Sequence, residues 1–389
     1  MTSASLVHWT EGDAVLSACW RSEAGLQPPK RARVADDTLT ADAAYRLASE
    51  GTTFVWRADF QNARQLLQAL ARRTDRKSHR KATGKVAPAS LLDAFNAHRQ
   101  AQGQRARILG SLLIPIAGDY SIPLRRAPDL REACTEAWGP PEGEASVASL
   151  RELLGVVGAH EWRKKGVEVE ALGRAPGNRI HPHYGVFSPV RGEYLDLVAK
   201  APLPGREMAF DIGTGTGVLA AILARRGVER VIATDMDDRA LACAQANVER
   251  LGVAAQGDVV KADLFPPGCA ELVVCNPPWL PARPSSPLEH AVYDEDSRML
   301  RGFLGGLKEH LAPGGEGWLI LSDLAEHLGL RPQGQLAAWI DAAGLRVLGR
   351  LDARPKHPKA SDPGDPLHDA RSREVTTLWR LGAAVTQQS

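Results

Sequence analysis

At 389 residues, the sequence is long enough for two or three domains of roughly 100 to 200 residues each. Hydrophobic residues make up 44% and charged residues 24% of the chain, and the net charge of +2 excludes a strongly basic or acidic protein whose composition alone would name its partner. The five cysteines have no Cys-x-x-Cys spacing, which predicts neither a disulfide framework nor a metal site. The sequence shows no signal pattern at its start and no apolar run near the ~18 residues of a membrane span, so we expect a cytoplasmic protein without a membrane span.

Residues 1–145 predict an α-rich N-terminal domain, which we expect to recognise the substrate. An extended segment is expected at 52–58. Helical periodicity is found at residues 40–50, 62–73, 91–102 and 129–138. The composition of 139–146, rich in Gly, Pro and Glu, predicts a linker after this domain.

Two segments predict irregular loops. Residues 72–85 hold seven Lys or Arg against one Asp, and residues 353–371 are rich in Pro, His and charge. The basic segment has two readings: contact with RNA phosphates or an acidic ribosomal surface, or an ordinary solvated loop.

Residues 146–200 predict a linker helix and a β-hairpin. Ser149 and Glu152 have the spacing of a capping box, and residues 167–187 resemble a hairpin. From 201 to 389 strands alternate with helices, which predicts parallel strands joined by crossover helices in a three-layer α/β domain. The strands are expected at 207–213, 228–235, 270–276, 317–323, 345–354 and 374–381, and the helices at 216–227, 237–252, 297–311 and 335–344.

The first strand of this domain ends in a glycine-rich turn, "FDIGTGTG". Gly213, Gly215 and Gly217 remove side chains where the backbone approaches a ligand, and the following helix offers free N–H groups. The spacing is G-x-G-x-G, whereas a dinucleotide site has G-x-G-x-x-G, so the pattern disfavours a NAD-dependent oxidoreductase.

Two acidic residues follow the next two strands. Asp235 stands 22 residues after Gly213, where a carboxylate can accept hydrogen bonds from both hydroxyls of a ribose. Asp263 could accept from an adenine amino group while Leu264 or Phe265 covers the base. The plainer alternatives are a helix cap for Asp235 and an ordinary loop acid for Asp263.

The strand at 272–275 ends in an unusual tip, "NPPW". Two prolines cannot continue a sheet ladder, so Asn276 and Trp279 are held stiffly at the edge of the sheet. The alternative is that Asn276 only ends the strand and that Trp279 packs inward.

Residues 211–253, followed by 262–265 and 273–279, resemble the core of class I S-adenosylmethionine-dependent methyltransferases with an N-P-P-[YFW] motif. That group includes HemK-type protein-glutamine N5-methyltransferases, DNA and RNA adenine N6-methyltransferases and ribosomal guanine N2-methyltransferases. The resemblance covers about residues 180–325 and implies a Rossmann-like, mostly parallel seven-stranded sheet with helices on both faces.

The resemblance also implies roles for individual residues. The cofactor would be S-adenosylmethionine. Its expected contacts are Asp211, Gly213, Thr214, Gly215, Gly217, Asp235, Met236, Asp263, Leu264 and Asn276. The expected catalytic residues are Asn276, Pro277, Pro278 and Trp279. The Asn276 side-chain oxygen and the Pro277 carbonyl would accept both hydrogens of a planar NH₂ group, and Trp279 would stack on it.

The implied function is methyl transfer to a planar nitrogen of a macromolecule, with a protein glutamine side chain favoured. RNA adenine N6 or guanine N2 is the alternative, and a non-catalytic RNA-binding or assembly protein with the same fold is the alternative of another class. The segment 181–198 departs from the HemK pattern at Val190, Arg191, Gly192 and Glu193. Arg191 and Glu193 could line the entrance of the site or form an exposed ion pair, and we assign no catalytic base to His181 or His183.

Overall fold

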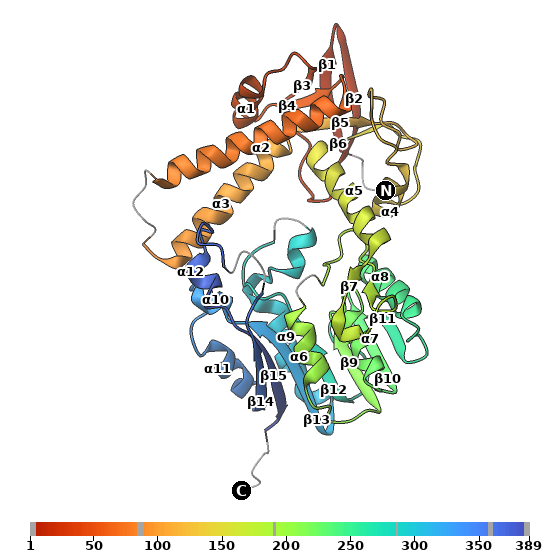
Figure 1. Ribbon diagram of the computed structural model, residues 1–389, viewed down its shortest axis with the longest axis vertical. Helices are drawn as coiled ribbons and strands as arrows, with labels where there is room; N and C mark the ends of the chain where they lie inside the picture. The colour runs from red at the N-terminus through yellow and green to blue at the C-terminus, as the bar shows by residue number, and fades with distance from the viewer. Residues whose placement is uncertain (1–4, 84–88, 190–191, 285–286, 357–360, 385–389) are drawn as a thin grey trace. The chain divides into compact units, whose positions relative to one another are not determined.

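The chain folds into two compact units, Met1–Glu161 and Trp162–Ser389 (Figure 1). The computed structural model describes all residues except 1–4, 84–88, 190–191, 285–286, 357–360 and 385–389, and no side chains at 77–83 and 287–288. The boundary falls later than residue 145, where the sequence predicted it, because residues 146–149 form a strand of the first unit's sheet.

The first unit contains a six-stranded mixed sheet in the order β1-β2-β6-β5-β4-β3. Its strands are β1 (Leu6–Glu11), β2 (Ala14–Arg21), β3 (Ala32–Ala35), β4 (Thr53–Trp56), β5 (Leu112–Ile116) and β6 (Ser146–Ser149). β3, β4 and β5 are parallel, and β1 also contacts β3, so the sheet curls. The unit is rich in helix, as predicted, but of its six strands only β4 was expected. β1 and β2 form a local hairpin that was not predicted, and the other strands are short and pair across long stretches of sequence, which leaves little local signal.

The helices of the first unit agree better with the sequence. They are α1 (Ala41–Ser49), α2 (Phe60–Thr83), α3 (Leu91–Leu109), α4 (Arg131–Trp138) and α5 (Leu150–Lys165). The prediction of a loop at 72–85 was wrong over residues 72–83, which continue α2. Arg and Lys are good helix formers, so a basic run can extend a helix that has already begun. The rest of that segment, 84–85, lies outside the described residues.

The second unit contains a seven-stranded sheet in the order β11-β10-β9-β12-β13-β15-β14, which confirms the predicted Rossmann-like fold. All neighbours pair in parallel except β15, which is antiparallel to β13 and β14. The strands are β9 (Met208–Ile212), β10 (Arg230–Asp235), β11 (Gly257–Lys261), β12 (Ala270–Cys275), β13 (Leu311–Ser322), β14 (Leu345–Ala353) and β15 (Thr376–Ala383).

Helices cover both faces of this sheet. They are α6 (Glu193–Lys200), α7 (Val218–Arg225), α8 (Asp238–Arg250), α9 (Arg298–His310), α10 (Leu324–His327), α11 (Gln335–Ala342) and α12 (His368–Arg371). α12 is a short helix inside the predicted loop at 353–371. Short 3-10 turns are formed by Glu170–Leu172, Pro287–Ala291 and Glu295–Ser297.

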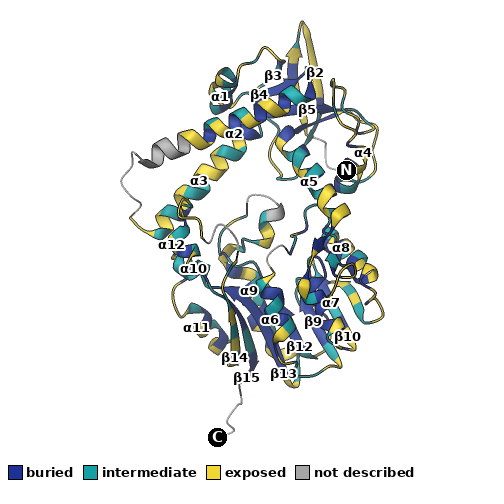
Figure 2. Ribbon diagram, viewed as in Figure 1, coloured by how far each residue is buried: buried dark blue, intermediate teal, exposed yellow. Residues whose placement is uncertain are grey.

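The strand before the Asn-Pro-Pro-Trp tip is buried on both faces. Leu272 and Val274 belong to the core under α6 and α7, whereas Val273 and Cys275 belong to the core under α9 and α11. All four side chains are at most 1% exposed, and Figure 2 shows the centre of the sheet as buried. Strict alternation between two apolar cores is typical of a central parallel strand.

The predicted hairpin is present as β7 (Val167–Glu168) and β8 (Arg179–Ile180). The chain after β8 is held to α8 by Asn247, which is fully buried. Its side-chain oxygen accepts from the His181 N–H at 2.8 Å, and its amide donates to the Thr216 carbonyl at 3.1 Å. One buried amide thus ties the segment before the α/β core to the glycine-rich turn.

We expect Asn247→Ala to lower the free energy of unfolding of the second unit by about 2–3 kcal/mol, because the His181 N–H and the Thr216 carbonyl lose a buried partner. Urea denaturation of the whole chain, followed by hydrogen exchange within the second unit, measures the change. Gln245→Ala, at an exposed position of the same helix, is the control and should stay within about 0.5 kcal/mol. Equal stability of both variants would contradict the assignment.

Candidate functional site

Strand register brings the predicted site residues to one edge of the second sheet. Ile212 of β9 pairs with Thr234 of β10 on one side and with Cys275 of β12 on the other. Since all three strands are parallel, the residues that follow them emerge at the same level. Neighbouring strands are about 4.8 Å apart, so the site between Asp235 and Asn276 is about 10 Å wide with the glycine-rich turn at its centre.

The glycine-rich turn adopts left-handed backbone conformations that glycine permits. The φ angles of Gly213, Gly215 and Gly217 are 71°, 55° and 77°. A Cβ on Gly217 would lie 3.1 Å from the Cα of Ala244 in α8, so this glycine serves helix packing. A Cβ on Gly215 would meet no atom within 4 Å, so the turn is open there to an incoming ligand.

Asp211, the last but one residue of β9, is a buried carboxylate behind the turn. Its Oδ2 accepts from the Thr214 hydroxyl at 2.7 Å and from the Ala220 N–H at 3.0 Å, while its Oδ1 has no hydrogen-bond partner among the described residues. Burial raises the pKa of Asp211 to about 6, and the two hydrogen bonds oppose this rise. A buried carboxylate oxygen without a partner is unusual and indicates that a donor is missing.

Asp235 ends β10 and holds the turn from the side. Its Oδ2 accepts from the Gly215 N–H and its Oδ1 from the Asp237 N–H, both at 3.0 Å. Each carboxylate oxygen has a second lone pair, so Asp235 can still accept from hydroxyl groups. The next residue, Met236, is 55% exposed although it is apolar. The helix-cap role falls to Asp237, whose side chain accepts from Arg239 N–H.

Asp263 and Leu264 follow β11 on the same side of the sheet. Leu264 has a φ angle of 70°, and its carbonyl accepts from the Thr234 hydroxyl at 2.6 Å. Asp263 is exposed and lies 3.8 Å from the Arg298 guanidinium. The proposed contact of Asp263 with an adenine amino group stays a prediction.

The Asn-Pro-Pro-Trp tip follows β12 on the other side of the turn. The indole N–H of Trp279 donates to the Asn276 side-chain oxygen at 3.0 Å. Trp279 is half-buried and packs against both cores of the sheet, and its carbonyl accepts from Arg331 at 3.3 Å. Pro277 is buried and Pro278 half-buried. Trp279 was expected to be a stacking surface, and its hydrogen bond to Asn276 was not expected from the sequence.

Three further residues surround the site without having been expected. Met299, at the start of α9, lies against Gly213. A Cβ added to Gly213 would be 2.4 Å from the Cε of Met299. Asp294 accepts from the Met299 and Leu300 N–H groups and so caps α9. Arg331 is 3% exposed, and its Nε and Nη1 have no hydrogen-bond partner. Asn247 could have been found from the sequence as a polar residue on the apolar face of α8. No comparable sequence signal marked Met299, Asp294 or Arg331.

The remaining predictions near the site have mixed outcomes. Arg191 and Val190 lie outside the described residues, and Glu193 begins α6. His181 is structural, since its Nδ1 lies 2.6 Å from the Arg163 carbonyl. All five cysteines are free, and no group of three metal-ligating side chains occurs among the residues with described positions. None of the described helices is long and apolar enough to span a membrane.

Comparison with known proteins places this geometry in a family. Residues 178–332 match the family described as the methyltransferase small domain. This segment, which is less than half of the chain, is similar to a class I methyltransferase domain. Its cofactor is S-adenosylmethionine.

The names of the individual relatives state different substrates. The ribosomal protein L11 methyltransferase of Pelotomaculum thermopropionicum is 35% identical over 40% of this chain and 43% of its own length. The release factor glutamine methyltransferase of Cereibacter sphaeroides is 36% identical over 42% of this chain and 57% of its own. The tRNA1(Val) (adenine(37)-N6)-methyltransferase of Shewanella halifaxensis is 27% identical over 51% of this chain and 82% of its own. The chain thus spans about half the length of the first two relatives.

The residues at the sheet edge fit S-adenosylmethionine. The unpartnered Oδ1 of Asp211 matches a cofactor that carries an ammonium and a sulfonium group, and Gly215 leaves room for its approach. Asp235 has lone pairs for ribose hydroxyls, and the exposed Met236 offers an apolar surface to adenine. When bound, the cofactor supplies an electrophilic methyl group.

We expect cofactor affinity to depend on the ionisation of Asp211. Its folded pKa of about 6 lies above the ordinary value of 3.8, so burial of the ionised form costs stability as pH rises from about 4 to about 6. The same ionised form attracts a cation. Calorimetry with S-adenosylhomocysteine, which keeps the ammonium group, should therefore show tighter binding at pH 7.5 than at pH 5.

Asp211→Asn supplies the matched variant. It should weaken binding at pH 7.5 and remove the pH dependence, while it raises the free energy of unfolding at pH 7.5 by on the order of 1–3 kcal/mol because no charge is buried. An affinity that varies with pH as strongly in Asp211→Asn as in the unchanged protein would show that another group titrates.

Proposed function

We propose that the second unit transfers the methyl group of S-adenosylmethionine to a planar nitrogen of a macromolecule, a protein glutamine side chain being favoured. The observation that carries the proposal is the register of β10, β9 and β12, which aligns Asp235, Gly213 and Asn276 along one sheet edge. A ligand on the turn faces the Asn-Pro-Pro-Trp tip across this edge. We propose that the first unit selects the target.

The tip suits a nitrogen that is a poor nucleophile. In an amide or an aromatic amine the nitrogen lone pair is delocalised. The Asn276 oxygen and the Pro277 carbonyl each accept one N–H hydrogen, which draws the nitrogen towards tetrahedral geometry and directs its lone pair at the methyl group. Such positioning is worth several kcal/mol. The nitrogen–carbon bond forms as the carbon–sulfur bond breaks, and the proton then leaves the cationic nitrogen to water, so no residue needs to act as a base.

The hydrogen bond from Trp279 supports one orientation of the Asn276 amide towards the acceptor. An indole N–H is only a donor, so it pairs with the side-chain oxygen and never with the NH₂ group. The second lone pair of that oxygen stays available to the acceptor nitrogen. A flipped amide would instead present its own N–H groups to the acceptor and repel it.

The glutamine preference is supported by the similarity to a release factor glutamine methyltransferase. A second candidate, an exocyclic amine of an RNA base, is favoured by the basic continuation of α2 and by the wide face of Trp279. Both acceptors are planar NH₂ groups, so the tip serves either.

Labelled S-adenosylmethionine and lysate from cells that lack this protein test the proposal. We expect label to enter macromolecules, to be lost on protease treatment and to survive ribonuclease if glutamine is the acceptor. Label that survives protease but is lost on ribonuclease treatment would show that RNA is the acceptor. Absence of both incorporation and cofactor binding would contradict it altogether.

Asn276→Ala tests the role of the tip in the same assay. The initial rate should fall by a factor of about 10² or more, because one of two hydrogen-bond acceptors for the reacting nitrogen is lost. Affinity for S-adenosylhomocysteine should stay within a few-fold. If Asn276→Ala keeps its rate, the acceptor role is wrong.

Replacement of Trp279 by 3-benzothienylalanine tests the orientation of Asn276, since sulfur replaces the N–H and the ring shape is kept. The initial rate should fall roughly three- to tenfold, the equivalent of one hydrogen bond. The control is the same replacement at Trp318, whose indole N–H donates to the Glu316 carboxylate at 3.0 Å but which lies within β13. Equal rates at both positions would leave Trp279 with a stacking role only.

A further inference from the structure

The first unit has a shallow groove that methyl transfer does not use. Its volume is about 440 Å³. It is lined by Asp37, Leu39, Trp56, Asn62, Gln65, Leu66, Ala69 and Arg72. Every lining residue belongs to the first unit and to its described part.

The groove lies at the carboxyl ends of two parallel strands of the mixed sheet. β3 and β4 are parallel, with Ala35 opposite Trp56, the last residues of the two strands. Asp37 and Leu39 follow β3, and the other lining residues belong to the end of β4 and to α2. Ligands of such sheets bind in the crevice at the carboxyl ends of the strands, next to the crossover helices.

The lining combines a mixed set of polar groups with an apolar floor. Asn62 donates to Asp37 at 3.0 Å, which leaves the amide oxygen of Asn62 and the second oxygen of Asp37 as acceptors. Gln65 is exposed and adds both a donor and an acceptor, and Leu66 is 8% exposed beneath them. Alternating donors and acceptors above an apolar surface suit the edge and face of a nucleobase.

Arginines extend the groove along α2. Arg72 lines it, and Arg76 follows one helical turn later on the same side, about 6 Å further along the axis. Both are exposed, and neither forms an ion pair among the described residues, whereas Arg73 is paired with Asp42 at 2.7 Å. Arg76 interacts with Asp42 only through space, as one of the charges that lower the Asp42 pKa. Two exposed guanidinium groups in a row can each contact a phosphate.

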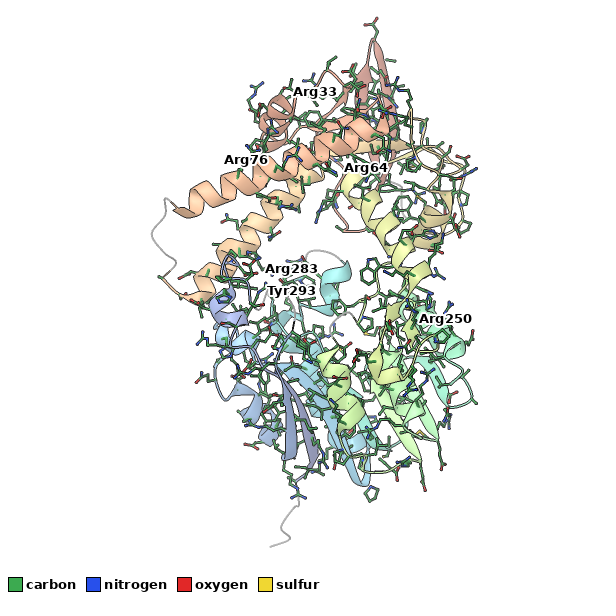
Figure 3. All side chains as sticks on the ribbon, viewed as in Figure 1. Arg33, Arg64, Arg76, Arg250, Arg283 and Tyr293 are labelled. Atoms are coloured by element: carbon green, nitrogen blue, oxygen red, sulfur yellow. The ribbon has the colours of Figure 1, made fainter. Side chains whose placement is uncertain are left out.

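Arg64 is exposed on α2 but is not part of the groove. It is absent from the lining residues, and at about 100° per residue it lies more than a quarter turn from the centre of the row formed by Gln65, Arg72 and Arg76. Its guanidinium donates to Gln61 at 3.2 Å. Figure 3 shows Arg64 and Arg76 on the helix.

We propose that this groove binds a single-stranded nucleic acid, with phosphates on Arg72 and Arg76 and a base against Asn62 and Gln65. Two exposed arginines in a row along α2 favour a strand with several phosphates over a free nucleotide. The inference goes beyond methyl transfer. It holds whether the methylated nitrogen belongs to RNA or to a protein bound on RNA.

Fluorescence anisotropy of the full chain with a labelled 12-nucleotide RNA, from 50 to 300 mM KCl, tests the proposal. We expect affinity to fall with salt. The slope of log K against log salt should become shallower by about 0.7 in Arg72→Gln and in Arg76→Gln, the value for one lost contact with a single strand. Asn62→Ala should weaken binding without changing the slope. Comparison of the affinities for RNA and for DNA of the same sequence shows whether ribose or deoxyribose is preferred. Binding of either nucleic acid supports the proposal.

Two variants serve as matched controls. Arg64→Gln removes the same charge from another face of the same helix, and Arg250→Gln removes it from the exposed last turn of α8 in the second unit. Both should bind like the unchanged protein. Circular dichroism confirms that all variants are folded.

Four results would overturn the proposal: no binding at 50 mM KCl, equal losses in all four arginine variants, displacement of RNA by polyglutamate at equal charge, or binding of AMP as tight as that of the RNA. Displacement by polyglutamate would assign the surface to an acidic protein, and tight AMP binding would assign it to a free nucleotide. The assay uses neither cofactor nor methyl transfer, so its failure leaves the proposed function standing.

Discussion

The register of three parallel strands is the constraint on which the site depends. β9 lies between β10 and β12, and Ile212 is paired on both sides at once. A shift of either neighbour by one residue would turn every side chain of that strand to the opposite face. In β12 such a shift would exchange the side chains that fill the two cores, Leu272 and Val274 in one and Val273 and Cys275 in the other, and would displace Asn276 from the level of the glycine-rich turn.

Polar groups at the site are held at a cost in stability. Asp211 is ionised at neutral pH in an apolar setting that raises its pKa to about 6, and one of its oxygens lacks a partner. Asn247, by contrast, is a buried amide whose bonds connect α8, the glycine-rich turn and the chain after the hairpin. The first residue is poised for a ligand and the second stabilises the fold, although both are polar and fully buried.

Much of the second unit could be predicted because its signals are local. Apolar runs marked β9, β10 and β12, and the alternation of strands and helices marked α7, α8, α9 and α11. The bond between Trp279 and Asn276 could not be predicted, because it depends on how the chain turns after two prolines. The six-stranded sheet was missed because the local hairpin of β1 and β2 was overlooked and because β6 pairs with β2 and β5, which are distant in the sequence. The helix at 72–83 was missed because its charge was taken as a sign of a loop.

The double burial of β12 has a consequence for how such a protein can change its target. A strand packed on both faces belongs to the part of a domain that opens only when the whole domain unfolds. Substitutions within it therefore lower the free energy of unfolding of the whole domain. Substitutions on the surface of the first unit, for which we propose target selection, would not carry this cost. Under that proposal, a change of target through the first unit would leave the reacting tip and its strand unchanged.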